Sequence, residues 1–175
     1  RPSAVVLVAT IRSLKMHGGQ PLNRLAEENL DALRAGGANL HRHLRNVTEL
    51  YGLPCVVAIN RFPTDTPAEI EALQALAAEA GVRAVLTEVH ARGGEGGIEL
   101  AREVAALAER SSRFRFVYET EDSLSVKIAK VATQVYGAEG VEYTRPASRM
   151  LKQLEQDGFG TAPVCIAKTQ YSFSD

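Results

Sequence analysis

Residues 54–66 read Pro-Cys-Val-Val-Ala-Ile-Asn-Arg-Phe-Pro-Thr-Asp-Thr, an uninterrupted apolar run followed by a polar loop. Because the run 55–59 shows no polar alternation, it predicts a strand buried on both faces, as in a parallel sheet. Asn60 then stands at the carboxyl end of the strand, where open α/β sheets bind ligands. No G-x-x-x-x-G-K-[ST] phosphate-binding motif occurs in the 175 residues. We therefore expect the chain to contribute part of a ligand site.

Other short apolar or β-branched runs predict a sheet around this strand. The predicted strands are residues 4–10, 55–60, 84–89, 115–118 and 164–167. Helical patterns lie between them, and the clearest begins at Thr66, where Pro67 suits the first helical position and Glu69 completes a capping box. Alternating strands and helices predict an α/β fold, a three-layer, mostly parallel sheet with flanking helices.

Composition limits the partners of the chain. Hydrophobic residues make up 45% and charged residues 23%, as in ordinary globular proteins. The formal charge is -1 and no basic block is interleaved with aromatics, so we expect no nucleic-acid partner. The longest apolar run, residues 4–9, is far below the roughly 20 residues that span a bilayer, so we expect no membrane partner and a cytoplasmic location.

Two further features of the sequence concern its cysteines and its ends. Cys55 and Cys165 lie in strand-like runs outside any C-x-x-C arrangement, which predicts small core residues. The chain begins without Met, directly before a predicted strand, which predicts an excised segment of a longer protein.

The turn after the first predicted strand is a candidate anion site. Lys15 and His17 stand beside Gly18 and Gly19, so a cation and a titratable ring accompany glycines that let backbone amides approach an anion. A solvated turn with a positive φ at a glycine explains the same residues equally well. The pattern alone leaves both interpretations open.

Residues at or just after the ends of the next two predicted strands are candidate ligand contacts. Asn60 can offer a donor and an acceptor to a heterocycle, or it can bond to its own loop. Phe62 and Pro63 can form a wall for a planar ligand, or Phe62 can cover the core. His90 follows the strand at 84–89 and either lines the same crevice or has a structural role.

Several of these blocks together resemble the formate-tetrahydrofolate ligase family, also called formyltetrahydrofolate synthetase. The resemblance runs through nearly the whole chain and is most specific in residues 5–19, 56–66, 93–96 and 167–175. It implies an ATP-dependent ligase that makes formyl phosphate from formate and passes the formyl group to N10 of tetrahydrofolate, releasing ADP and phosphate. The implied cofactors are ATP, Mg²⁺ and a monovalent cation (K⁺ or NH₄⁺), and tetrahydrofolate is the implied co-substrate. The resemblance also implies that the complete protein is a homo-oligomer.

The resemblance also implies how the chain is divided. The family's P-loop lies upstream of these residues, so the fold implied is the remainder of a P-loop NTPase-like nucleotide domain plus a smaller α/β domain. We place the later part of the nucleotide domain at residues 1–60. Residues 61–175 are then the smaller domain, which contributes to the folate pocket and is truncated at its C-terminal end. Such a segment is expected to be inactive alone.

Carried over residue by residue, the resemblance assigns roles to the candidates. Asn60 corresponds to adenine or loop recognition, while Phe62, Pro63 and Leu86 line the folate pocket. His90 stands where many relatives have a stacking Trp, and this departure predicts weaker stacking, by about 1 kcal/mol.

Lys15 and His17 are inferred to face the phosphate or formyl end, so Lys15→Ala is expected to lower turnover far more than Lys152→Ala. Two other functions of the chain are alternatives to a ligase fragment. One is a noncatalytic nucleotide-binding or regulatory α/β module, and the other is a self-associating interaction domain.

Overall fold

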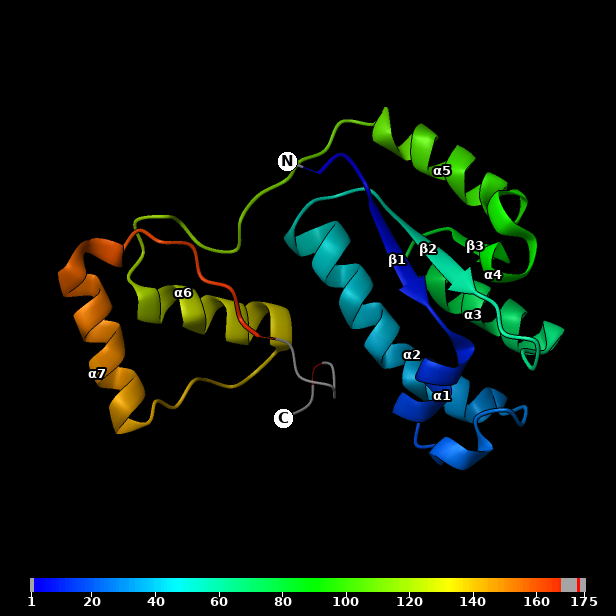
Figure 1. Cartoon of the computed structure of the whole chain (residues 1–175), viewed down its shortest axis with the longest axis horizontal. Helices are drawn as coiled ribbons and strands as arrows, with labels where there is room; N and C mark the ends of the chain where they lie inside the picture. Colours follow the sequence, from blue (N-terminus) through cyan, green and yellow to red (C-terminus); the bar gives the residue numbers. More distant parts are fainter. Residues whose placement is uncertain (1, 168–172, 174–175) are drawn as a thin grey trace. The chain divides into compact units, whose positions relative to one another are not determined.

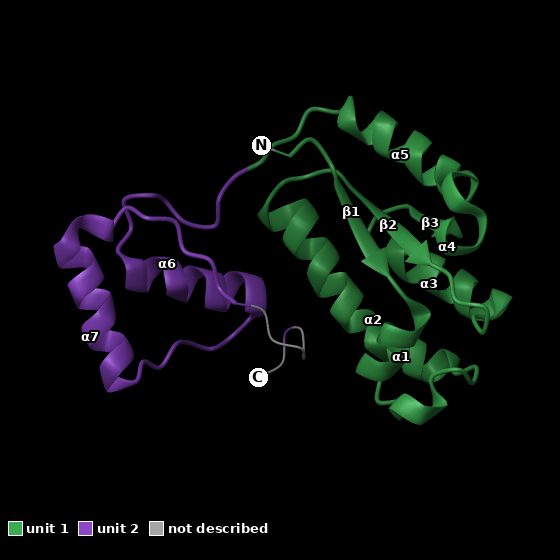
Figure 2. Cartoon of the chain, viewed as in Figure 1, with its two compact units in different colours: residues 1–114 green, residues 115–175 purple. Residues whose placement is uncertain are grey.

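The computed structural model describes residues 2–167 and residue 173 (Figure 1). The chain divides into two compact units, Arg1–Phe114 and Arg115–Asp175 (Figure 2). Unit 1 holds the sheet, which continues past residue 60, where the sequence analysis placed a domain boundary. The assignment of residues 1–60 and 61–175 to nucleotide and folate regions stays a prediction.

The sheet of unit 1 is parallel, as predicted. Its strands β1 (Val5–Ala9), β2 (Cys55–Asn60) and β3 (Ala84–Thr87) are ordered β1-β2-β3. Val5 pairs with Cys55 at one end, and Ile59 pairs with Leu86 near the other. The central strand β2 is buried except at Asn60, which agrees with its uninterrupted apolar sequence.

Helices cover both faces of this sheet, which confirms the α/β class (Figure 1). One face packs against α1 (Ile11–His17), α2 (Leu30–Arg45) and α3 (Pro67–Glu79), with Leu14, Leu33 and Leu73 in the core. The other face packs against α5 (Ile98–Ala108) through Val56, Val85 and Leu107. Alternate strand residues therefore enter separate cores, as the pleat of a sheet requires.

Side-chain caps fix where the helices of unit 1 begin. Thr10 accepts the Ser13 amide at the start of α1, and Asn29 accepts the Ala32 amide at the start of α2. The predicted capping box of α3 is present: Thr66 Oγ1 accepts the Glu69 amide, and Glu69 Oε2 accepts the Thr66 amide. The shorter elements are η1 (Leu22–Arg24), η2 (Asn46–Leu50), α4 (Val89–Arg92) and η3 (Gly93–Gly97).

Unit 2 is helical in its described residues, so the two strands that the sequence predicts there are wrong. It contains α6 (Leu124–Lys130), η4 (Val131–Tyr136), α7 (Arg145–Leu154) and η5 (Glu155–Phe159). The predicted strands 115–118 and 164–167 do not form, because neither has a strand to pair with in the described part of the unit. Instead, the Tyr118 hydroxyl donates to Val164 O at 3.1 Å and accepts from Val164 N at 2.9 Å.

A buried lysine fixes the chain that follows η5. Lys127 is fully buried, and its Nζ donates to the Gly160 carbonyl at 2.8 Å and to the Ala162 carbonyl at 3.1 Å. The same ammonium lies 5.9 Å from the centroid of the Tyr118 ring. A buried cation is thus solvated by carbonyl oxygens and an aromatic face, which offset part of its desolvation cost.

The two cysteines differ in environment. Cys55 is buried as predicted, and burial raises the pKa of its thiol to about 11. Cys165 is exposed, so its prediction as a core residue is wrong, because its segment is not a buried strand.

Among the helices of the described residues, none combines the length and apolar character needed to cross a bilayer.

Candidate functional site

The carboxyl ends of the parallel strands bring three connecting segments to one edge of the sheet. Thr10 leads from β1 into α1, residues 61–66 lead from β2 into α3, and Glu88 leads from β3 into α4. Ligands of open α/β sheets bind at this edge. The segment after β2 carries Phe62 and Pro63, two of the predicted site residues.

The loop after β2 is held by Asp65. Asp65 Oδ2 accepts the Phe62 amide at 2.8 Å, and the Asp65 amide donates to Phe62 O at 3.0 Å. Asp65 is buried, and burial raises the pKa of its carboxyl against the opposing effect of the Phe62 hydrogen bond. The backbone of Phe62 is therefore fixed by a desolvated side chain of its own loop.

The Phe62 ring contacts the segment after β1. The Arg12 guanidinium, in the first turn of α1, lies 5.1 Å from the centroid of the half-buried Phe62 ring. A cation over an aromatic face at this distance is attracted by the ring quadrupole. Two connecting segments of the sheet edge thus meet at Phe62.

A second set of contacts joins the segments after β2 and β3. The Arg61 amide donates to Thr87 O at 3.1 Å, and Arg61 Nη1 lies 2.6 Å from Glu88 Oε1. Arg92 Nη1 approaches the other Glu88 oxygen at 3.5 Å. The ion pairs are partly exposed and add little stability, but the Arg61–Glu88 pair and the Arg61–Thr87 hydrogen bond place residues 60–62 beside residues 86–90.

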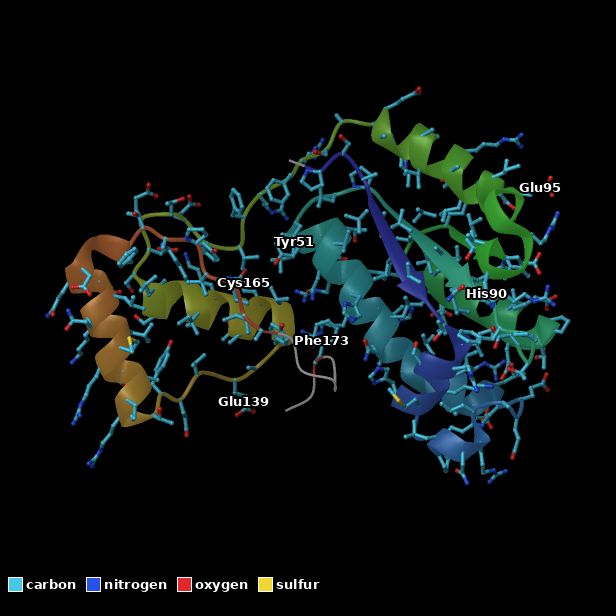
Figure 3. All side chains as sticks on the ribbon, in the orientation of Figure 1. Tyr51, His90, Glu95, Glu139, Cys165 and Phe173 are labelled. Atoms are coloured by element: carbon cyan, nitrogen blue, oxygen red, sulfur yellow. The ribbon has the colours of Figure 1, made fainter. Side chains whose placement is uncertain are left out.

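The structure therefore places the predicted folate-side residues on neighbouring segments. Asn60 and Leu86 are half-buried near the ends of adjacent strands, and Leu86 also packs against the core. Pro63 is exposed in the loop after β2. His90 is exposed on α4, in the segment that follows β3 (Figure 3).

Lys15 and His17 are placed differently from these residues. His17 is exposed in the last turn of α1, whereas the Lys15 side chain is 1% exposed. Lys15 Nζ donates to Glu69 Oε1 at 2.7 Å and to the Glu27 carbonyl at 2.8 Å. This geometry is that of a buried ion pair, and the direct role of Lys15 at a phosphate or formyl group stays a prediction.

Comparison with known proteins identifies the family. The model of the family described as formate-tetrahydrofolate ligase matches residues 1–175. The chain belongs to the formate-tetrahydrofolate ligase family. A formate-tetrahydrofolate ligase from Symbiobacterium thermophilum is 69% identical to it over 175 residues, which are 100% of this chain and 32% of that relative. The chain thus spans about a third of the length of this relative.

Two charged residues near the site of this ligase-family chain were missed by the sequence analysis. Glu69 was predicted only as part of a capping box, although its Oε1 also accepts the Asn29 amide at 3.1 Å and pairs with Lys15, 54 positions away. Arg12 was given no role, because an arginine at a helix start has no distinctive pattern. The capping box was the available signal for Glu69, and no local signal indicated its pairing with Lys15.

The Glu69 carboxyl has a pKa below its ordinary value. Burial alone would raise it, but the hydrogen bonds from Lys15 Nζ and from the Thr66 and Asn29 amides outweigh that effect. A carboxyl with a lowered pKa in the folded state stabilises the fold above its unfolded pKa, about 4.3. That contribution is lost as the pH falls through the folded value.

We therefore expect Glu69→Gln to destabilise the protein at neutral pH and to differ less from the parent below about pH 4. The substitution removes the charge that compensates Lys15, and acid removes the same charge from the parent. Urea unfolding at a series of pH values measures this difference. Glu71→Gln, at an exposed position of the same helix, is the matched control and should change stability little throughout. A Glu69→Gln effect of constant size across the series would contradict the expectation.

Proposed function

We propose that this chain is part of an ATP-dependent ligase that joins formate to tetrahydrofolate. The supporting observation is the family match along all 175 residues, with 69% identity to a formate-tetrahydrofolate ligase. In the proposed reaction, a formate oxygen attacks the γ-phosphorus of ATP, which forms formyl phosphate and releases ADP. N10 of tetrahydrofolate then attacks the formyl carbon, phosphate leaves, and the proton of N10 is released.

The contribution of this segment is the folate side of the site. The proposed wall for the flat pterin ring consists of Phe62, Pro63, Leu86 and His90. Asn60 is proposed to serve in adenine or loop recognition. The ion pair between Arg61 and Glu88 and the Arg61–Thr87 hydrogen bond support this proposal, because they join the two contributing segments. A fixed wall lowers the entropic cost of orienting N10 toward an acyl phosphate.

The remainder of the proposed site lies in other parts of the complete ligase. The segment carries no P-loop motif, so we propose that it is inactive alone. Val8, on the edge strand β1, is 63% exposed, an apolar surface that further chain of a longer ligase would cover. We propose a cytoplasmic, homo-oligomeric enzyme.

The proposed ions are assigned to no residue of this segment. Mg²⁺ and a monovalent cation (K⁺ or NH₄⁺) remain part of the proposal for the complete ligase. The part of the chain that the structure describes gathers no group of three or more His, Cys, Asp or Glu side chains able to hold a metal. We derive no step through an ion.

Phe62→Ala tests the folate assignment in the full-length ligase that carries this segment. We expect the KM for tetrahydrofolate to rise about tenfold or more, because the pterin loses an aromatic stacking partner, while the KM for ATP stays the same. Phe159→Ala removes a ring that is 56% exposed in unit 2 and should leave both constants unchanged. A Phe62→Ala ligase with an unchanged KM for tetrahydrofolate would show that Phe62 is structural and is not part of the folate wall.

A further inference from the structure

The side chain of Arg12 is unusual for a half-buried arginine. Its Nε is buried and has no hydrogen-bond partner in the described part of the chain. Its guanidinium lies 5.1 Å from the centre of the Phe62 ring. A buried donor without an acceptor is destabilising, so an arginine in this position needs another favourable interaction.

The favourable interaction in the structure is with the Phe62 loop. The ring supplies an electron-rich face for the guanidinium, and the attraction is stronger where water is excluded. Asp65, which binds the Phe62 amide, also interacts with the charge of Arg12: burial raises the pKa of Asp65, and Arg12 is among the groups that oppose this rise. Phe62 is thus held at its backbone by Asp65 and at its ring by Arg12.

We propose that Arg12 is a positioning residue for tetrahydrofolate, acting through the Phe62 ring. An unrestrained phenylalanine in a loop rotates about its side-chain bonds, and a pterin that stacks on it must then immobilise it. Arg12 covers part of the ring before the substrate arrives and so reduces that cost. The inference rests on the proposed function, because it takes Phe62 as a wall of the folate site.

The test is a double-mutant cycle in the full-length ligase that carries this segment. The variants are Arg12→Met, Phe62→Ala and the combination of both, with Arg12→Lys to retain a cation. Arg34→Met is the matched control, since Arg34 is 61% exposed on α2. The KM values for tetrahydrofolate, ATP and formate are measured for each variant, together with the melting temperature.

We expect Arg12→Met to raise the KM for tetrahydrofolate about fivefold to tenfold and to leave the KM for ATP and formate unchanged. Arg12→Lys should stay within about twofold of the parent, because the cation remains over the ring. In the Phe62→Ala background, Arg12→Met should have no further effect, since the ring through which it acts is gone. A residue with only a structural role would change the melting temperature without this selectivity for one substrate.

Two outcomes would overturn the inference. Independent effects of Arg12→Met and Phe62→Ala would show that Arg12 acts without the ring. An equal rise of the KM for ATP after Arg12→Met would show a contact with nucleotide or phosphate instead. If Phe62→Ala alone leaves the KM for tetrahydrofolate unchanged, the proposed folate role of Phe62 has failed; if it raises that KM but does not couple to Arg12, only the inference has failed. Arg12→Gln repeats the test if Arg12→Met does not fold.

Discussion

Lys15→Ala is expected to lower the free energy of unfolding by about 3–5 kcal/mol. Lys15 and Glu69 have 1% and 0% of their side-chain surfaces exposed, and 2.7 Å separates Nζ from Oε1. Removing the ammonium leaves a buried carboxylate that keeps its backbone donors but loses its counter-charge. Urea and thermal unfolding of the full-length ligase that carries this segment measure the loss.

Two further variants make this expectation specific. Lys152→Ala removes an exposed lysine of α7 and should change stability by less than about 0.5 kcal/mol. The double variant Lys15→Met with Glu69→Gln should recover part of the loss, because neither partner then carries a buried charge. A Lys15→Ala enzyme of normal stability with a large fall in turnover would restore the direct chemical role that the sequence pattern predicts.

The sequence predicts those features of the fold that depend on neighbouring residues. The apolar run of β2 indicates a strand buried on both faces, and the Thr66 capping box indicates where α3 begins; both are confirmed. The run at 164–167 has the same apolar character but no strand to pair with among the described residues, so its prediction as a strand is wrong. A strand requires a partner, and local composition does not supply that information.

The candidate site shows the same division between local and distant information. Asn60 is the last residue of β2 and Phe62 lies in the loop that follows, both as predicted, because the end of a strand is a local feature. The contact between Arg12 and Phe62 and the ion pair between Lys15 and Glu69 join segments far apart in the sequence. Lys15 beside His17 and two glycines is typical of an anion site, yet α1 directs its ammonium into the core, where Glu69 and the Glu27 carbonyl bind it.

Gly36 is a position where a single added methyl group is expected to be strongly destabilising. A Cβ at Gly36 would lie 1.8 Å from the carbonyl oxygen of Leu14, and a Cβ at Gly18 would lie 1.8 Å from that of Ala32. The backbones of α1 and α2 therefore touch, and a shift of backbone rather than of a flexible side chain is needed to admit the methyl group. A glycine inside a helix costs about 1 kcal/mol relative to alanine, so without this contact Gly36→Ala would stabilise α2.

We therefore expect Gly36→Ala to destabilise the protein by about 3 kcal/mol or more, opposite in sign to the helix propensity. Gly94→Ala is the matched control in the same unit, because a Cβ there meets no atom within 4 Å. Thermal unfolding of the two variants gives the comparison, and a Gly36→Ala protein as stable as the parent would contradict the close packing of α1 on α2. Since α1 also carries Arg12, a displaced α1 should move the guanidinium from the Phe62 ring. Any Gly36→Ala protein that folds should then show a raised KM for tetrahydrofolate as well as a lower melting temperature, which links the packing of two glycines to the geometry of the proposed folate wall.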